Sequence, residues 1–178
     1  LYLKYLVDEI KELQAVTYQS LSLLPEYSFN LSNYYGYLLS QLKLREEVPQ
    51  ILSGVSFSLT KIELQEITYI GDFVEESIQI LSPVLKTNLS QSGYSIYHES
   101  FRRFIIDHLK SKSISIDQKI FRPIIEWFDS KSFFGYQKSY RYYLQFLTEG
   151  GSYEKVLSLL DKKFVTDSII NGQSWKLI

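Results

Sequence analysis

A series of short, sharply bounded segments over residues 48–109 constrains the fold of this chain more than any single motif. Within it, Thr60-Lys61-Ile62-Glu63 has the spacing of a helix capping box. In that motif a threonine hydroxyl and a glutamate carboxylate bind backbone amides that the first helical turn leaves free. The spacing therefore predicts a helix that starts at Thr60 and runs to about Thr68.

Two further helices are predicted on either side of this one. Pro49 predicts the first turn of a helix over residues 49–57. The backbone N–H groups of a first turn have no partner within the helix, so proline, which lacks an N–H, is tolerated there. Gly71 interrupts the chain, and Asp72 is a typical cap for a third helix. The apolar face of that third helix consists of Val74, Ile78 and Leu81.

The segment after the third helix has the pattern of a β-hairpin. Two short runs, 84–87 and 94–97, flank a polar loop from Asn88 to Gly93. Three helices followed by a hairpin is the order of a winged helix, a helix-turn-helix with an appended β-hairpin. We therefore expect residues 48–110 to form a winged-helix domain.

Helices are predicted on both sides of this domain, so the fold class is mainly α. Residues 1–13 form one amphipathic pattern, and a second helix is predicted from Asn30, its cap, to about Arg45 within a linker subdomain, residues 1–47. A helix follows the hairpin with Phe101, Phe104, Ile105 and Leu109 on its buried side. Residues 111–178 then contain helical patterns over 116–128, with a kink at Pro123, over 136–147, and over 153–160 after Gly150-Gly151. They predict either the start of an α-solenoid or a plain helical subdomain.

Composition narrows the functional classes. Nineteen Lys and Arg against 20 Asp and Glu give a net charge of −1, so no overall field attracts nucleic acid or an anionic membrane. The chain has no cysteine and no apolar run long enough to cross a bilayer, and we expect a cytoplasmic protein without a membrane partner. It also has no methionine, even at position 1, so we expect a piece of a longer protein.

No complete nucleotide-binding or catalytic motif is present in the sequence, so catalysis by this piece alone is not expected. His98 and His108 are ten residues apart and fall on different helical faces, which disfavours a metal site. In the predicted recognition helix, Glu75 and Glu76 would face a polyanion without any base beside them, so DNA reading by this helix is not expected.

The best candidate for a binding residue is His98, where the second hairpin strand meets the next helix. Free amides at a helix start and an imidazole at the same place can bind an anion. The alternative is a half-buried histidine that is satisfied within the fold. Arg102 and Arg103 would either neutralise a phosphate or pair with Glu75-Glu76.

In this order, the segments resemble the C-terminal part of the nucleotide-binding module of STAND-class signalling ATPases, which include NACHT and NB-ARC proteins. Tyr97-His98-Glu99 stands at the place of the family's Met-His-Asp motif, and Ser100-Phe101-Arg102 is similar to its common bacterial continuation. Residues 1–6 resemble the helix that follows a Gly-x-Pro motif, and residues 139–144 resemble the start of a superhelical sensor. Tyr97 replaces the family's Met, and Glu99 replaces its Asp.

The resemblance implies a role for this chain in a switch. His98 would contact the β-phosphate of bound ADP, with Tyr97, Glu99 and Arg102 as supporting residues. ADP or ATP with magnesium would bind mainly at a P-loop outside this chain. The resemblance further implies packing on the protein's own ATPase core, capture of a protein ligand by the C-terminal helices, and homo-oligomers in bacterial antiviral defence or signalling. The alternatives are a winged-helix transcription regulator with a helical sensor, and a protein-interaction scaffold without a nucleotide.

Overall fold

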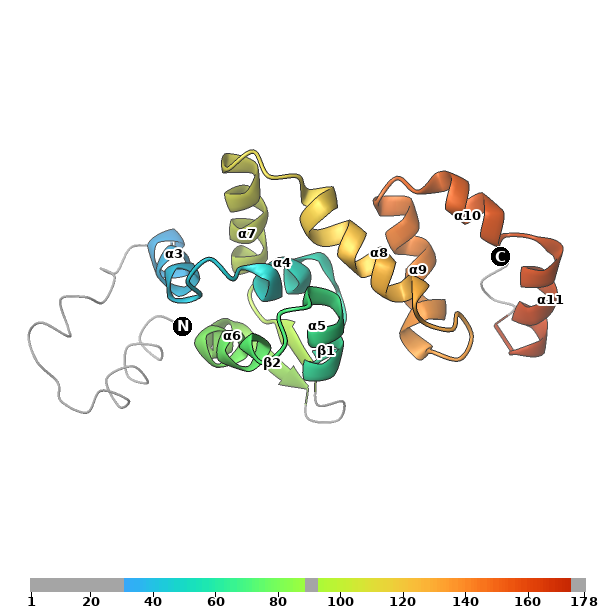
Figure 1. The fold of residues 1–178 in the computed structure, drawn as a ribbon, viewed down its shortest axis with the longest axis horizontal. Coiled ribbons are helices and arrows are strands. Elements are labelled where there is room, and N and C mark those ends of the chain that lie inside the picture. Colours follow the sequence, from blue (N-terminus) through green and yellow to red (C-terminus); the bar gives the residue numbers. More distant parts are fainter. Residues whose placement is uncertain (1–30, 89–92, 174–178) are drawn as a thin grey trace, which may run out of the picture. The chain divides into compact units, whose positions relative to one another are not determined.

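The chain is mainly helical, with one small antiparallel sheet, as expected for its fold class. A computed structural model describes residues 31–88 and 93–173 (Figure 1). The predicted helix over residues 1–13, the Asn30 cap and most of the predicted hairpin loop lie outside these ranges. The chain divides into two compact units, Leu1–Ser113 and Ile114–Ile178, which are described separately below.

The first two described helices are shifted from their predicted limits. Helix α3, Ser32–Gln41, stops before Arg45 because Lys43 and Leu44 adopt left-handed backbone angles, with φ of 50° and 74°. Helix α4, Glu47–Gly54, begins two residues before Pro49 and ends three residues before Phe57. Pro49 still lies in the first turn, as predicted, and Val55 leaves the helix with an extended backbone.

The capping box is present and starts helix α5, Lys61–Thr68. The Thr60 hydroxyl accepts a hydrogen bond from the Glu63 amide at 3.2 Å, and a Glu63 carboxylate oxygen accepts one from the Thr60 amide at 2.6 Å. Gly71, with φ of 57°, lies in the turn before helix α6, Phe73–Leu81. The prediction of Asp72 as a side-chain cap was wrong, because its side chain makes no capping hydrogen bond.

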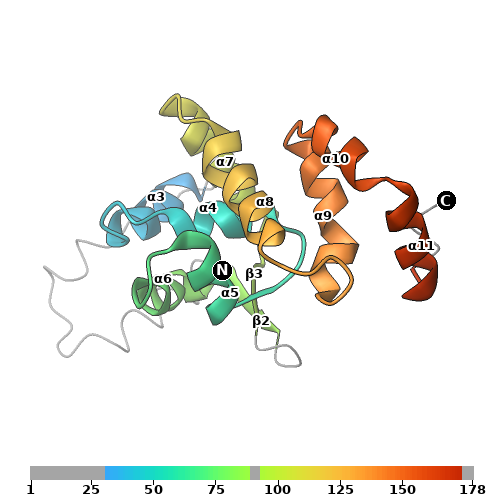
Figure 2. The same ribbon diagram turned by 45° about the vertical axis from the view of Figure 1, so that its right-hand side comes forward.

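The sheet has three strands rather than the predicted two. After a short 3₁₀ turn, η1 (Ser82–Val84), strand β2 (Leu85–Asn88) pairs antiparallel with β3 (Gly93–Ile96) (Figure 2). On the other edge of β3 lies β1, Leu59–Thr60, which gives the order β1-β3-β2. A Cβ at Gly93 would lie 2.9 Å from the Cβ of Ser58, so this close approach of β3 to β1 requires glycine.

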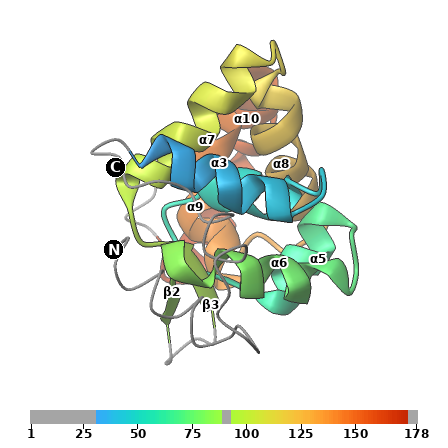
Figure 3. The same cartoon turned by 90° about the vertical axis from the view of Figure 1, so that its left-hand side faces the viewer.

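Helix α7, Glu99–Ser111, follows the sheet and holds the first unit together. It packs on α4 and on β3, and α3 in turn contacts both α6 and α7 (Figure 3). Phe101, Ile105 and Leu109 are buried as predicted, whereas Phe104 is only half-buried. The fully buried side chains around them include Tyr35, Leu38, Ile51, Leu52, Leu64 and Leu81.

The second unit consists of helices. The helix predicted over residues 116–128 is divided just before Pro123: a wider π-helical turn, η2 (Asp117–Phe121), leads directly into α8, Arg122–Asp129. Pro123 occupies the first turn of α8, where proline is well tolerated. Helix α9, Gln137–Glu149, packs on α8 and ends at Gly150 as predicted. Phe128, Tyr143, Phe146 and Leu147 are buried in this unit.

Two short helices, α10 (Tyr153–Leu159) and α11 (Lys162–Ile170), complete this unit. No residue of α10 is fully buried, and its predicted apolar residues Tyr153 and Leu157 are 62% and 73% exposed. Ile169 of α11 is 60% exposed. Within residues 31–88 and 93–173, no helix has both the length and the apolar character that a membrane span requires.

Candidate functional site

His98 lies at the junction between the sheet and α7 and is held there by main-chain hydrogen bonds on both sides. Before it, the Tyr97 amide donates to the Val84 carbonyl at 2.9 Å. After it, the His98 carbonyl accepts hydrogen bonds from the amides of Phe101 at 3.0 Å and Arg102 at 3.3 Å. His98 is thus the N-cap residue of α7, where helical amides point toward the start of the helix.

The imidazole of His98 carries an unsatisfied polar atom. Its Nε2 is buried and has no hydrogen-bond partner among the described residues, and the His98 side chain does not cap α7. A buried polar atom left without a partner costs about 1–3 kcal/mol. The ring of Tyr97, which is 63% exposed, meets the His98 ring edge-on with centroids 4.4 Å apart. Because Nε2 is buried, a ligand can reach it only if this atom becomes exposed.

Glu99 pairs with the two arginines that follow it on α7 rather than with His98. A carboxylate oxygen of Glu99 lies 3.3 Å from Nε of Arg102, and the other lies 3.9 Å from Nε of Arg103. The predicted alternative, pairing of these arginines with Glu75-Glu76, was wrong. Those two acids pair instead with Lys61 at 2.7 Å and Arg45 at 3.7 Å, respectively, because these cations flank α6.

Arg102 is directed into the fold. Its Nη1 donates to three carbonyls at the end of α4, those of Leu52 at 3.1 Å, Ser53 at 2.5 Å and Val55 at 2.7 Å. The last carbonyls of a helix lack partners and carry the negative end of its dipole, so a guanidinium is well suited to bind them. Only 21% of the Arg102 side chain is exposed, whereas 78% of the Arg103 side chain is exposed.

The two acids of α6, Glu75 and Glu76, are each paired with a neighbouring cation. The hydrogen bond with Lys61 lowers the pKa of the Glu75 carboxyl, and the same contact raises the pKa of the Lys61 ammonium. Glu75 is therefore held in its charged form, and the neighbouring cation is engaged by it. The guanidinium of Arg45 also stacks on the ring of Phe73, 3.3 Å from its centroid.

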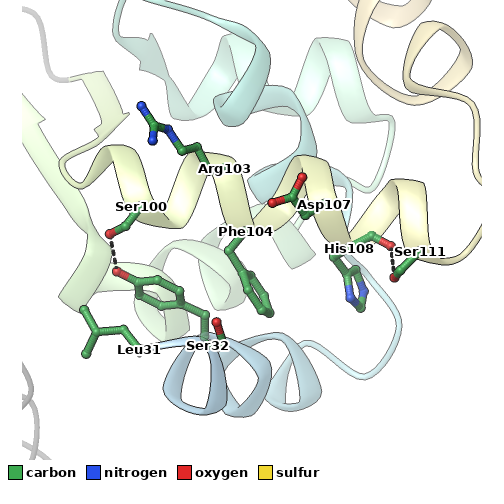
Figure 4. Close-up of a pocket in the computed structure, with 9 residues that line it drawn as sticks. Leu31, Ser32, Ser100, Arg103, Phe104, Asp107, His108 and Ser111 are labelled. Atoms are coloured by element: carbon green, nitrogen blue, oxygen red, sulfur yellow. Dashed lines mark hydrogen bonds between the residues drawn. The ribbon is translucent and has the colours of Figure 1, made fainter. Parts of the chain in front are cut away.

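A groove of about 560 Å³ runs between α3 and α7 (Figure 4). Phe104 and His108 point toward α3, while Arg103 and Asp107 point away from it. At one end the hydroxyls of Tyr35 and Ser100 are hydrogen-bonded at 2.8 Å. The groove is lined by Leu31, Ser32, Tyr35, Ser100, Arg103, Phe104, Asp107, His108 and Ser111.

His108 has a structural partner, unlike His98. Its Nε2 lies 3.3 Å from each carboxylate oxygen of Glu46, and Nζ of Lys112 lies 3.3 Å from the same carboxylate. Glu46 precedes α4, and His108 lies near the end of α7, so this cluster joins the two helices at the end remote from His98. In the described ranges no group of three or more His, Cys, Asp or Glu side chains is arranged to hold a metal.

The second unit contains a polar cluster of its own. The Tyr143 hydroxyl donates to one carboxylate oxygen of Asp129, and Nζ of Lys155 contacts the other. Burial, followed by the hydrogen bond to Asp129, raises the pKa of the Tyr143 phenol well above its usual range. These contacts tie α8, α9 and α10 together and point to a structural role.

The structure thus brings Tyr97 against His98, and Glu99 against Arg102, but it does not bring Glu99 against His98. The carbonyl partners of Arg102 and the hydrogen bond between Tyr35 and Ser100 were not predicted from the sequence. Both connect residues 47 to 65 positions apart, which no local pattern reveals. No family model, curated protein or solved structure matches this chain.

Proposed function

We propose that this chain is a regulatory part of a STAND-type ATPase switch, with a winged-helix unit that senses the phosphate of bound ADP through His98. The nucleotide, with magnesium, would bind mainly at a P-loop elsewhere in the protein. Residues 31–113 would pack on the ATPase core in the resting state. The helices over residues 114–178 would receive a protein ligand, and release would permit assembly into a homo-oligomer in the cytoplasm, in bacterial defence or signalling.

One observation carries this proposal: at the start of a 13-residue helix, the Nε2 atom of His98 is buried and has no hydrogen-bond partner within residues 31–88 and 93–173. A phosphate oxygen placed there would accept a hydrogen bond from the imidazole and would face the amide ends of α7. The Glu99 and Ser100 amides come before the first main-chain bonds of α7, which the Phe101 and Arg102 amides make to His98. A ligand could therefore satisfy an imidazole atom that the described part of the chain leaves unbonded.

Such a switch requires different affinities in its two states. A phosphate that binds His98 only in the resting arrangement shifts the equilibrium toward that arrangement by the difference in binding free energy. Equal affinity in both arrangements would shift nothing. His98 would therefore act as a lock, and loss of its imidazole would favour the released state.

The test is His98→Ala in the full-length protein, with ADP retention and basal activity measured together. We expect faster ADP release and higher basal activity. The matched control is His108→Ala. His108 is the other histidine of the chain; it contacts Glu46 and lies in the last turn of α7, far from His98. If ADP retention and basal activity are both unchanged in His98→Ala, the phosphate-sensing role is wrong.

A protein-interaction scaffold without a nucleotide is the second candidate, and one observation favours it. Tyr153, Leu157 and Leu160 lie at i, i+4 and i+7 and are each 47% or more exposed, so the second unit presents an apolar stripe. This candidate predicts that His98→Ala has no effect on nucleotide retention, while Leu157→Asp abolishes partner capture.

The third alternative, a transcription regulator, predicts salt-dependent duplex binding by this chain at micromolar concentration. Lys61 and Arg45, the cations beside α6, are paired with Glu75 and Glu76, and this pairing argues against DNA binding by α6.

A further inference from the structure

Arg102 is connected to both the end of α4 and the backbone of His98. Its side chain donates to the Leu52, Ser53 and Val55 carbonyls, and its own main-chain amide donates to the His98 carbonyl. A single residue therefore carries an unbroken path of hydrogen bonds from the last turn of α4 to the residue that precedes α7. Arg103, the adjacent cation on α7, is 78% exposed and pairs with Glu99.

We infer that Arg102 is the positioning residue for His98: it anchors the first turn of α7 to the end of α4 and so fixes where the imidazole lies. This inference rests on the proposed function and gives it a second residue. The sequence left open whether Arg102 would neutralise a phosphate or pair with Glu75-Glu76, and the structure instead directs its guanidinium to main-chain carbonyls. It acts through His98 and does not itself bind the phosphate.

The chemistry of the carbonyl cluster explains why an arginine suits this position. Leu52, Ser53 and Val55 present carbonyls from both sides of the helix end, because Val55 has already turned to an extended backbone. One guanidinium nitrogen, Nη1, makes all three contacts, so the carbonyls share its two hydrogens. A separate donor, Nε, lies 3.3 Å from Glu99, and the group keeps its charge at any physiological pH. A lysine places its charge on one nitrogen and therefore could not bind the carbonyls and Glu99 through separate donor groups.

The test uses this 178-residue chain labelled with ¹⁵N at histidine. It contains two histidines, so the imidazole spectrum consists of two sets of signals, and His108→Ala assigns them. We expect Arg102→Ala to shift and broaden the His98 signals, and Arg102→Lys to restore them in part. Arg103→Ala removes the same charge one residue away and should leave the His98 signals in place.

A second control separates positioning from general stability. Leu109→Ala removes a fully buried side chain near the other end of α7 and should lower the melting temperature without moving the His98 signals. If Arg102→Ala leaves the His98 signals unchanged, or if Leu109→Ala moves them equally, the positioning role is wrong.

The full-length protein supplies the functional readout. Arg102→Ala should accelerate ADP release severalfold, Arg102→Lys less, and Arg103→Ala little. The double variant with His98→Ala should release ADP no faster than His98→Ala alone, since Arg102 acts through that residue. Additive effects would overturn the inference. If His98→Ala alone has no effect on ADP, the proposed function fails, while the histidine spectra still decide whether Arg102 positions His98.

Discussion

Glu99 is the residue whose charge bears most directly on an anion at the start of α7. It is the first residue of the helix, where a carboxylate stabilises the positive end of the helix dipole. The same carboxylate repels a phosphate that approaches those amides. The ion pairs with Arg102 and Arg103 offset this repulsion only in part. The Glu99 side chain is 64% exposed, and solvent weakens ion pairs at exposed side chains. Glu99 therefore favours α7 but opposes the proposed ligand.

We accordingly predict that Glu99→Gln strengthens anion binding by this chain. Removing one negative charge at the helix start should raise the affinity for pyrophosphate by about two- to fivefold at low ionic strength. Isothermal titration at low and at physiological salt would measure it, and the gain should shrink as salt increases. Asp107→Asn, two turns along the same helix and similarly exposed at 76%, is the matched control. A lower affinity in Glu99→Gln would mean that Glu99 matters more for holding Arg102 than for repelling phosphate.

At the scale of elements, the start of α5 depends on one local motif. Thr60 and Glu63 exchange side-chain to main-chain hydrogen bonds, and Thr60 also belongs to β1, which pairs with Gly93 of β3. The capping box thus joins the start of a helix to the edge of the sheet. Because the strand pairing uses only the backbone of Thr60, its side chain can be altered without removing β1 from the sheet.

We predict that Thr60→Ala lowers the free energy of unfolding of the first unit by about 0.5–2 kcal/mol, the usual effect of losing a helix cap. Thr60→Ser keeps the hydroxyl and should retain most of that stability. Urea denaturation followed by circular dichroism would measure both. Thr68→Ala, at the other end of α5, removes a hydroxyl that bonds only the Leu64 carbonyl and should have a smaller effect. Equal losses at the two positions would show that the capping box is not what stabilises α5.

The features that could be predicted from the sequence are those that depend on residues close together in the chain. The capping box was found as predicted because both partners lie within four residues, and the hairpin was found because two short runs flank a loop. The missed features depend on distant residues. Strand β1 has only two residues and exists because β3 lies beside it, and the end of α4 is bonded by Arg102, about 50 residues later. In the candidate site, the sequence predicted His98 and its neighbours. It could not predict that Arg102 is directed into the fold while Arg103 is exposed, because this depends on where the end of α4 lies.

At the scale of the whole molecule, the chain consists of two units, and the candidate site lies in the first. The described hydrogen bonds of His98 and Arg102 join residues of Leu1–Ser113. The boundary falls after α7, where Ser113 has a left-handed backbone with φ of 56°. Each unit has its own buried residues, such as Leu52 and Leu81 in the first and Ile124 and Leu147 in the second. Separate cores of this kind can unfold separately.

The distribution of tryptophan makes this separation measurable. Trp127 is buried in the unit Ile114–Ile178, and the first unit contains no tryptophan, so a change in tryptophan fluorescence follows unfolding around Trp127, while circular dichroism follows both units. We predict that Leu52→Ala, which opens a cavity at a side chain with 0% exposure, destabilises the first unit by about 2–5 kcal/mol and leaves the fluorescence transition in place.

The reciprocal variant completes the test at this scale. Leu147→Ala, also at 0% exposure, should shift the fluorescence transition and leave the His98 imidazole signals unchanged, because residue 147 belongs to the other unit. If either variant shifts both transitions equally, the units unfold as one cooperative body. The ligand capture proposed for the second unit would then be coupled directly to the stability of the site around His98. If the transitions move independently, the proposed coupling would require contacts with the rest of the protein.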